Sequence, residues 1–221
     1  MVNLNRDECR VLGTMIEKAQ TVPGQYPITL NALTNGCSQK NNRDPVTNLS
    51  EDQVFEAVDT LRGKGIVREV MLTGSRVAKF RHVAREIFAV STEELVILAE
   101  LWLRGPQSAA ELRANASRMA PLESVESVTA LLHAMAARPE PFVRELPRRS
   151  GERTTRFVQL ISPDLHDVSA PLHSDAGTHE VHQGSRQTDE QLLQRLERLE
   201  KQWVELKASV DSLVAAVGRL G

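Results

Sequence analysis

Cysteine is scarce in this chain: Cys9 and Cys37 are the two among 221 residues, far apart in the sequence. So few thiols exclude a disulfide-stabilised secreted scaffold, and both are expected as small buried side chains of a reduced, cytoplasmic protein of bacterial type. Aromatic residues make up only 4% of the chain, so its cores must consist mainly of Leu, Val, Ala and Ile. No apolar run approaches the roughly 20 residues of a membrane span, and the first residues contain no hydrophobic signal segment, so no membrane association is expected.

A strongly basic region is also missing. The net charge is −2, residues 1–90 carry 12 Lys/Arg against 10 Asp/Glu, and residues 91–161 carry 9 of each. Tight binding to the DNA backbone requires several cations facing the phosphates, so a balance this even argues against tight nonspecific binding.

Enzyme signatures are absent as well. The sequence has no Gly-rich phosphate loop, no His-Glu-x-x-His, no Cys-x-x-Cys and no Gly-x-Ser-x-Gly, so neither a catalytic site nor a cofactor is expected. Four histidines, at positions 166, 173, 179 and 182, would suit a metal-binding tract. Their irregular spacing, without a nearby cysteine pair, favours a solvated segment instead, and no metal site is predicted.

A predicted helix followed by a hairpin is the most informative pattern present. Ser50 and Gln53 form a capping box at the start of a helix over residues 50–64. Val54, Val58 and Leu61 give that helix one apolar face. Residues 66–72 and 76–82 then alternate as two strands that turn at residues 73–75, where Gly74 permits a positive φ. A helix feeding directly into such a hairpin is typical of a winged helix-turn-helix domain.

The same order of elements is predicted twice. Asn5 and Thr29 cap the first two helices of the first copy, and residues 26–28 suit a short strand between them. Ser91 and Ser108 cap the first two helices of the second copy, a third helix follows Pro121, and strands are predicted over residues 142–146 and 154–161. The prediction is a mainly α protein of the α+β class with tandem winged helix-turn-helix domains at residues 1–88 and 89–161.

Two further segments follow the predicted domains. Residues 162–188 are rich in Ser, Gly, Asp and His, with few large apolar side chains, so a disordered linker is predicted there. Residues 189–221 carry an unbroken heptad repeat that predicts a parallel two-stranded coiled coil and a homodimer. A helix that folds back on its own domains, or pairs antiparallel, is the alternative. The predicted core positions are Leu192, Leu196, Leu199, Trp203, Leu206, Val210, Leu213 and Val217.

The candidate contact residues lie in a polar loop and on the two predicted hairpins, because the outward faces of both third helices lack a cationic surface. The helix over residues 50–64 should expose Asp52, Glu56 and Asp59, which repel phosphate. The contact residues proposed from sequence are Gln39, Lys40, Asn41, Asn42, Arg43, Arg76, Lys79, Arg81, Arg148, Arg149 and Arg153. Cations of this kind would hold phosphates while Asn or Gln reads a base edge. The alternative is ordinary solvated surface, with Arg43 pairing a nearby carboxylate.

Several stretches of the sequence form a recognisable signature. Its main part is the run QKNNRDPVTNLSE at residues 39–51. Glu17-Lys18 and residues 25–27 belong to it upstream, and residues 74–77, 103–107, 111–113 and 141–143 belong to it downstream. With these stretches the chain resembles the YceH-like family of uncharacterised bacterial proteins. The resemblance implies two winged-helix domains and supplies no catalytic residues, since the family has no established activity.

Two functional hypotheses follow from these patterns. The first is a non-catalytic DNA-binding or regulatory protein that acts as a dimer on double-stranded DNA. The alternative is an adaptor whose winged-helix domains dock a protein partner, which the acidic third helices and the even charge balance favour.

Overall fold

Helices and a small antiparallel sheet alternate in the first half of the chain. The structure, a computed structural model, describes residues 2–71, 77–148, 154–162 and 165. In chain order the elements of this half are α1 (Arg6–Thr21), η1 (Pro23–Gln25), β1 (Ile28–Thr29), α2 (Leu30–Cys37), α3 (Glu51–Gly63), β2 (Val67–Val70), β3 (Lys79–His82) and α4 (Ala84–Phe88). The predicted capping boxes are confirmed, because Asn5 accepts from the backbone N–H of Glu8 and Ser50 accepts from that of Gln53. The short helix α4 was not predicted.

The second half repeats this order. Its elements are α5 (Thr92–Arg104), β4 (Gln107–Ser108), α6 (Ala109–Ala116), α7 (Val125–Ala136), β5 (Val143–Glu145) and β6 (Arg156–Gln159). Capping boxes begin α5 at Ser91 and α6 at Ser108, as predicted. A further box at Ser124 begins α7, where the sequence analysis named only the preceding proline. Because each cap satisfies backbone N–H groups that the first turn leaves free, helix starts follow from local sequence.

Each half contains one antiparallel sheet of the same topology. The strand orders are β1-β3-β2 and β4-β6-β5, so the first strand of each half pairs with the last. In the first sheet Ile28 faces Phe80 and Val67 faces His82. The strands are shorter than predicted, and the predicted turn at residues 73–75 lies outside the described residues. The α+β class is confirmed by these helices and small sheets.

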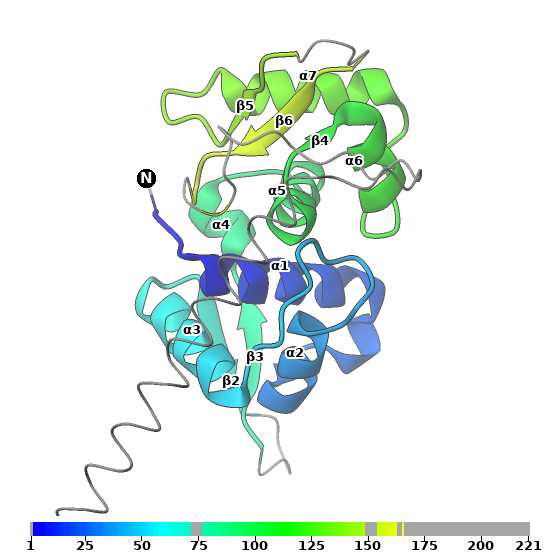
Figure 1. The fold of residues 1–221 in the computed structure, drawn as a ribbon. Helices are drawn as coiled ribbons and strands as arrows, with labels where there is room; N and C mark the ends of the chain where they lie inside the picture. The colour runs from blue at the N-terminus through cyan, green and yellow to red at the C-terminus, as the bar shows by residue number, and fades with distance from the viewer. Residues whose placement is uncertain (1, 72–76, 149–153, 163–164, 166–221) are drawn as a thin grey trace, which may run out of the picture. The chain divides into compact units, whose positions relative to one another are not determined.

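The two halves meet along α1 and α5, which form the most extensive helix pair in the described structure (Figure 1). Leu12, Ile16 and Leu98 are fully buried in the shared core. Gly13 allows the close approach, because a Cβ at this position would lie 3.0 Å from Cγ of Leu103 and 3.4 Å from the carbonyl oxygen of Ala99. Both halves therefore belong to one compact unit, which spans Met1–Leu172.

The described chain ends against this core. Ser162, the first residue of the predicted linker, is buried and exchanges two hydrogen bonds with the side chain of Gln159. Leu165 is half-buried and packs on the core. The rest of the predicted linker, apart from these two residues, and the whole predicted coiled coil lie outside the described residues. No helix in the described part of the chain combines the length and the apolar character that crossing a membrane requires.

We predict that Gly13→Val lowers the free energy of unfolding by about 1–3 kcal/mol, because the added side chain overpacks the contact with α5. Gly63→Ala is the matched control, since a Cβ at Gly63 meets nothing within 4 Å. It should be neutral, or stabilising by up to about 1 kcal/mol, through helix propensity. Urea unfolding of both variants provides the measurement. Wild-type stability in Gly13→Val would contradict the close packing of α1 on α5.

Candidate nucleic-acid interface

The polar loop at residues 38–48 is held against both halves of the molecule. Nη2 of Arg10, on α1, donates to the carbonyl of Pro45 at 2.6 Å. The backbone N–H of Asp44 donates to the carbonyl of Leu103, on α5, at 2.8 Å. The loop is thus a structural part of the junction between α1 and α5, as well as the link between α2 and α3.

Arg43 lies inside that junction. Its side chain is 0% exposed, and Nη2 lies 2.5 Å from Oε2 of Glu17, which is 2% exposed. The same nitrogen donates to the carbonyl of Gly36 at 2.8 Å. A buried guanidinium with these partners is not available to a phosphate on the surface. Arg43 is therefore corrected from a contact residue to a structural one, in agreement with the alternative of a carboxylate partner.

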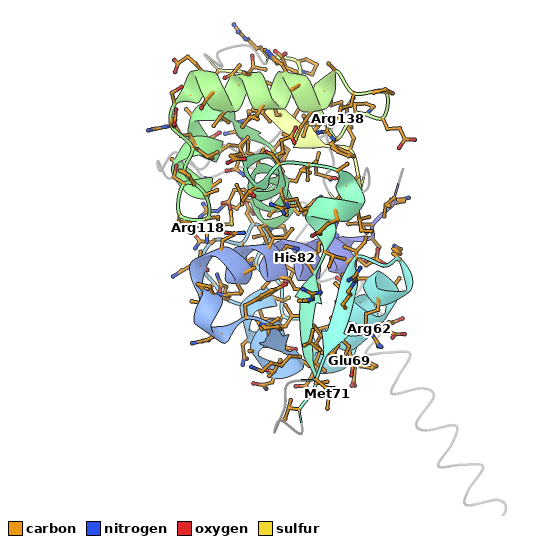
Figure 2. The ribbon with its side chains drawn as sticks, turned by 180° about the vertical axis from the view of Figure 1, so that it is seen from behind. Arg62, Glu69, Met71, His82, Arg118 and Arg138 are labelled. Carbon is orange, nitrogen blue, oxygen red and sulfur yellow. The ribbon has the colours of Figure 1, made fainter. Side chains whose placement is uncertain are left out.

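The ion pair at Glu17 extends across both halves as a network. Arg118, after α6, places Nη1 2.5 Å from Oε1 of Glu17 and Nη2 3.1 Å from Oε2 of Glu100. Arg118 is labelled in Figure 2. Nε of Arg104 lies 2.8 Å from Oε1 of Glu100, and its Nη2 donates to the side chain of Asn42. We call Glu17, Arg43, Glu100, Arg104 and Arg118 the junction network. It links α1, the polar loop, α5 and the segment after α6.

The pKa values of the two carboxylates in the junction network shift in opposite directions. Burial alone would raise the pKa of Glu17, but the hydrogen bonds and charges of Arg43 and Arg118 outweigh it and hold that pKa below its ordinary value. At Glu100 burial dominates and holds the pKa above its ordinary value, although Arg118 and Arg104 oppose it. Glu17 is therefore the better-compensated charge of the two.

The remaining loop candidates divide between structure and surface. Gln39 accepts from Nζ of Lys18 at 3.1 Å and donates to the carbonyl of Asn41 at 2.9 Å. Oδ1 of Asn42 accepts a hydrogen bond from Nη2 of Arg104. Lys40 and Asn41 are exposed, so among the candidate contact residues of the loop these two are accessible to a ligand.

The outward face of the first sheet carries three cations. Arg68 of β2 stands directly opposite Arg81 of β3, and Lys79 stands opposite Val70 on the same face. Arg68 and Arg81 are exposed and Lys79 is half-buried. Within the described chain, none of the three forms an ion pair. We call these three residues the basic sheet face. Like charges placed opposite one another are unfavourable unless an anion lies between them, so this face is suited to bind phosphate.

The carboxylate next to Arg68 in the sequence pairs on the other side of the hairpin, away from the basic sheet face. Glu69, beside Arg68 in sequence, points to the other side of the hairpin and pairs with Arg62 of α3 at 3.0 Å. Figure 2 shows Arg62 next to Glu69, with Met71 further toward the hairpin tip. Lys79 and Arg81 were predicted as contacts, whereas Arg68 was missed, since only the strand register places it opposite Arg81.

The second hairpin offers less free charge among its described residues. Arg148 is exposed and its Nε donates to the hydroxyl of Thr155 at 3.0 Å. Arg156 pairs with Glu111 of α6 at 3.2 Å. Three further candidates, Arg76, Arg149 and Arg153, lie outside the described residues, as do the predicted oligomerisation residues.

Neither third helix has a cationic outer face. On α3 the exposed side chains include Asp52, Glu56 and Asp59, as predicted, and also Phe55, which the sequence had placed beside the apolar face. The sequence of α7, VESVTALLHAMA, contains no Lys or Arg. Carboxylates facing phosphate are repulsive, so major-groove insertion of α3 is unfavourable.

The two cysteines do not form a reactive site. Both are fully buried, and burial raises the pKa of Cys9 to about 12 and that of Cys37 to about 11. Thiols with such pKa values remain protonated at neutral pH and are poor nucleophiles.

Comparison with known proteins places this arrangement in a family. The family described as "Protein of unknown function, DUF480" matches residues 4–152, and the chain belongs to it. A UPF0502 protein of Shewanella sp. (strain ANA-3) is 38% identical over 220 residues, covering 98% of this chain and 100% of the relative. A UPF0502 protein of Citrifermentans bemidjiense is 45% identical over 173 residues, covering 77% of this chain and 80% of the relative. The predicted membership of an uncharacterised bacterial family is confirmed.

Three stretches that carried the resemblance meet at the junction network. Glu17, Arg43 and Arg104 come from separate stretches of the sequence, yet they form one chain of ionic contacts through Arg118 and Glu100. Sequence reasoning missed this role. A Glu on an amphipathic helix and an Arg in a polar loop are each ordinary, and only their contact in space distinguishes them.

We predict that Glu17→Gln and Glu100→Gln have different effects at neutral pH. The lowered pKa of Glu17 means that its charge stabilises the fold at neutral pH, and this stability is lost as the pH falls through the folded-state pKa. Glu17→Gln should therefore cost about 1–3 kcal/mol at neutral pH and much less in acid. The raised pKa of Glu100 acts in the opposite direction, so Glu100→Gln should be neutral or stabilising at neutral pH. Urea unfolding at several pH values compares them, and equal costs at neutral pH would contradict the assignment.

Proposed function

We propose that this protein is a non-catalytic DNA-binding or regulatory protein built from two winged-helix domains. The support is the repeated order of three helices and a terminal hairpin, with a short strand between the first and second helices that pairs with the last strand. The protonated buried thiols and the absence of enzyme motifs from the sequence support the non-catalytic part of the proposal.

The basic sheet face is the observation that carries DNA binding. Arg68, Lys79 and Arg81 project from one side of a hairpin, unneutralised by carboxylates in the described part of the chain. Phosphate contacts of this kind position a protein on a duplex without reading its sequence. Exposed Lys40 and Asn41 in the polar loop, and Arg148 on the second hairpin, are further candidate contacts.

The mode of binding differs from groove insertion by the third helix. The acidic exposed side of α3 disfavours its approach to phosphate, so the sheet face and hairpins make the contacts in this proposal. The junction network holds the two halves in one unit, so the contacts of the two hairpins keep a constant separation. Two sites at a constant separation gain affinity when both reach the same duplex.

We predict that the double variant Arg68→Gln/Arg81→Gln binds mixed-sequence duplex DNA more weakly than wild type. Loss of two phosphate contacts should reduce the slope of log affinity against log salt by about 1.8, at about 0.9 per contact. Fluorescence anisotropy, titrated from low to physiological salt, gives both quantities.

Arg6→Gln/Arg85→Gln is the matched control for that measurement. Both arginines are exposed and lie on helices, Arg6 on α1 and Arg85 on α4, outside the hairpin strands, and the change in net charge is identical. The control should retain the wild-type salt slope. Equal weakening in both double variants would show that only net charge matters and would remove the basic sheet face from the interface.

Dimerisation through residues 189–221 completes the proposal. The heptad repeat of leucine and β-branched residues supports a parallel pair of helices, and a dimer would double the number of DNA contacts.

We predict that Leu199→Asp/Leu206→Asp converts a dimer to a monomer in sedimentation velocity. The substitution Gln194→Asp/Lys201→Asp, outside the apolar positions, is the control. A wild-type chain that sediments as a monomer would overturn the dimer.

A protein-interaction adaptor is the second candidate function, and the exposed side of α3 favours it. Phe55 is 49% exposed there, among Asp52, Glu56 and Asp59. An exposed aromatic ring beside carboxylates suits a basic protein surface better than DNA. Failure of the wild-type chain to bind duplex DNA even at low salt would make this the better function.

A further inference from the structure

A groove on the second half is lined by one side of α7. The groove has a volume of about 500 Å³ and lies between α7, the segment after α6 and the first turn of α5. Leu122, Ala130, Leu131 and Ala134 form its apolar lining, and Glu93 and Glu123 add carboxylates. We call this feature the apolar groove. It is separate from the basic sheet face, which belongs to the first half.

The stripe on α7 has the spacing of a helix-packing surface. Ser127, Ala130, Leu131 and Ala134 follow one another at i, i+3, i+4 and i+7, the pattern by which a helix packs against another element. The core of the second half already uses a different side of α7, through Val128, Leu132 and Met135. Ala130 and Ala134 remain exposed. Their small side chains permit the close approach of a second helix.

The polar chemistry of the groove favours a helix over a small molecule. Small-ligand sites hold their ligands by several converging polar groups, whereas this lining offers one hydroxyl and two carboxylates. An α-helix satisfies its own backbone hydrogen bonds and presents only side chains, so it needs few polar partners from the groove.

The carboxylates of the groove indicate which charges the partner helix should carry. Neither Glu93 nor Glu123 forms an ion pair within the described chain. Arg113 lies close by, but its guanidinium donates to the backbone carbonyl of Glu123 at 3.1 and 3.2 Å. α7 itself has no Lys or Arg. An incoming helix that carries Lys or Arg beside its apolar stripe would therefore bring these cations to the unpaired carboxylates of Glu93 and Glu123.

We propose that the apolar groove binds an amphipathic helix of a partner protein, with small or medium apolar side chains on one face and Lys or Arg flanking them. This inference does not depend on DNA binding, and it gives the adaptor hypothesis a specific site.

Two labelled synthetic peptides test the proposal on the full-length protein by fluorescence anisotropy. One is a short amphipathic Leu/Lys helix, and the other has the same leucines with Glu in place of Lys. The Leu/Lys peptide should bind saturably, and Ala134→Arg, which fills the groove, should weaken that binding by about tenfold or more. Ala114→Arg, on an exposed position of α6 outside the groove, adds the same side chain and should leave it unchanged.

Glu93→Gln/Glu123→Gln keeps the shape of the groove and removes its charge. It should weaken binding of the Leu/Lys peptide severalfold at low salt and have less effect at high salt. Duplex DNA affinity, measured on the same variants, separates failure of this proposal from failure of the nucleic-acid proposal.

Three outcomes would overturn the proposal. The first is equal affinity for the Leu/Lys peptide in wild type and Ala134→Arg, with both folded by circular dichroism. The second is Leu/Glu binding as tight as Leu/Lys binding. The third is tighter, Ala134-dependent binding of a peptide of residues 189–221, which would assign the groove to the chain's own heptad segment.

Discussion

The carboxylate of Glu17 imposes the constraint on which the arrangement of the two halves depends. It is buried between α1 and the second half, and a buried charge is tolerated only when opposite charges and hydrogen bonds surround it. Arg43 reaches it from the polar loop and Arg118 from the second half, each at 2.5 Å. Separating α1 from α5 would leave this charge without one of its partners. Gly13 adds a steric counterpart, because its missing side chain lets the two helices approach.

This constraint also governs which cations remain available at the surface. Arg43 and Arg118 are committed to Glu17, Arg104 is committed to Glu100 and Asn42, and Arg156 is committed to Glu111. In the part of the chain that the structure describes, where charge is nearly balanced, the unpaired charged side chains therefore form small groups. The basic sheet face is such a group of cations, and the pair of carboxylates beside the apolar groove is its acidic counterpart. The two lie on different halves, so the proposed contacts with DNA and with a basic helix use separate surfaces.

The separation of these surfaces links the two candidate functions. The acidic exposed side of α3 and the lack of Lys and Arg on α7 both depart from what a groove-reading helix requires, while the hairpin of the first half retains cations. In the two proposals the helices are therefore the surfaces for protein partners, and the sheet is the surface for phosphate. Fold alone would not have indicated this division, because function resides in the side chains that a fold presents.

Local sequence determined where α1, α3, α5 and α6 begin, because capping boxes at Asn5, Ser50, Ser91 and Ser108 need only residues three positions apart. The acidic side of α3 followed equally from helical spacing. Tertiary structure decided the role of Arg43, whose partner Glu17 lies 26 residues away, and of Arg118, which lies 101 residues from that same carboxylate. It also decided that Arg68 stands opposite Arg81, since strand register sets that pairing. Periodicity describes one element at a time, whereas ionic contacts between elements depend on how the chain packs in three dimensions.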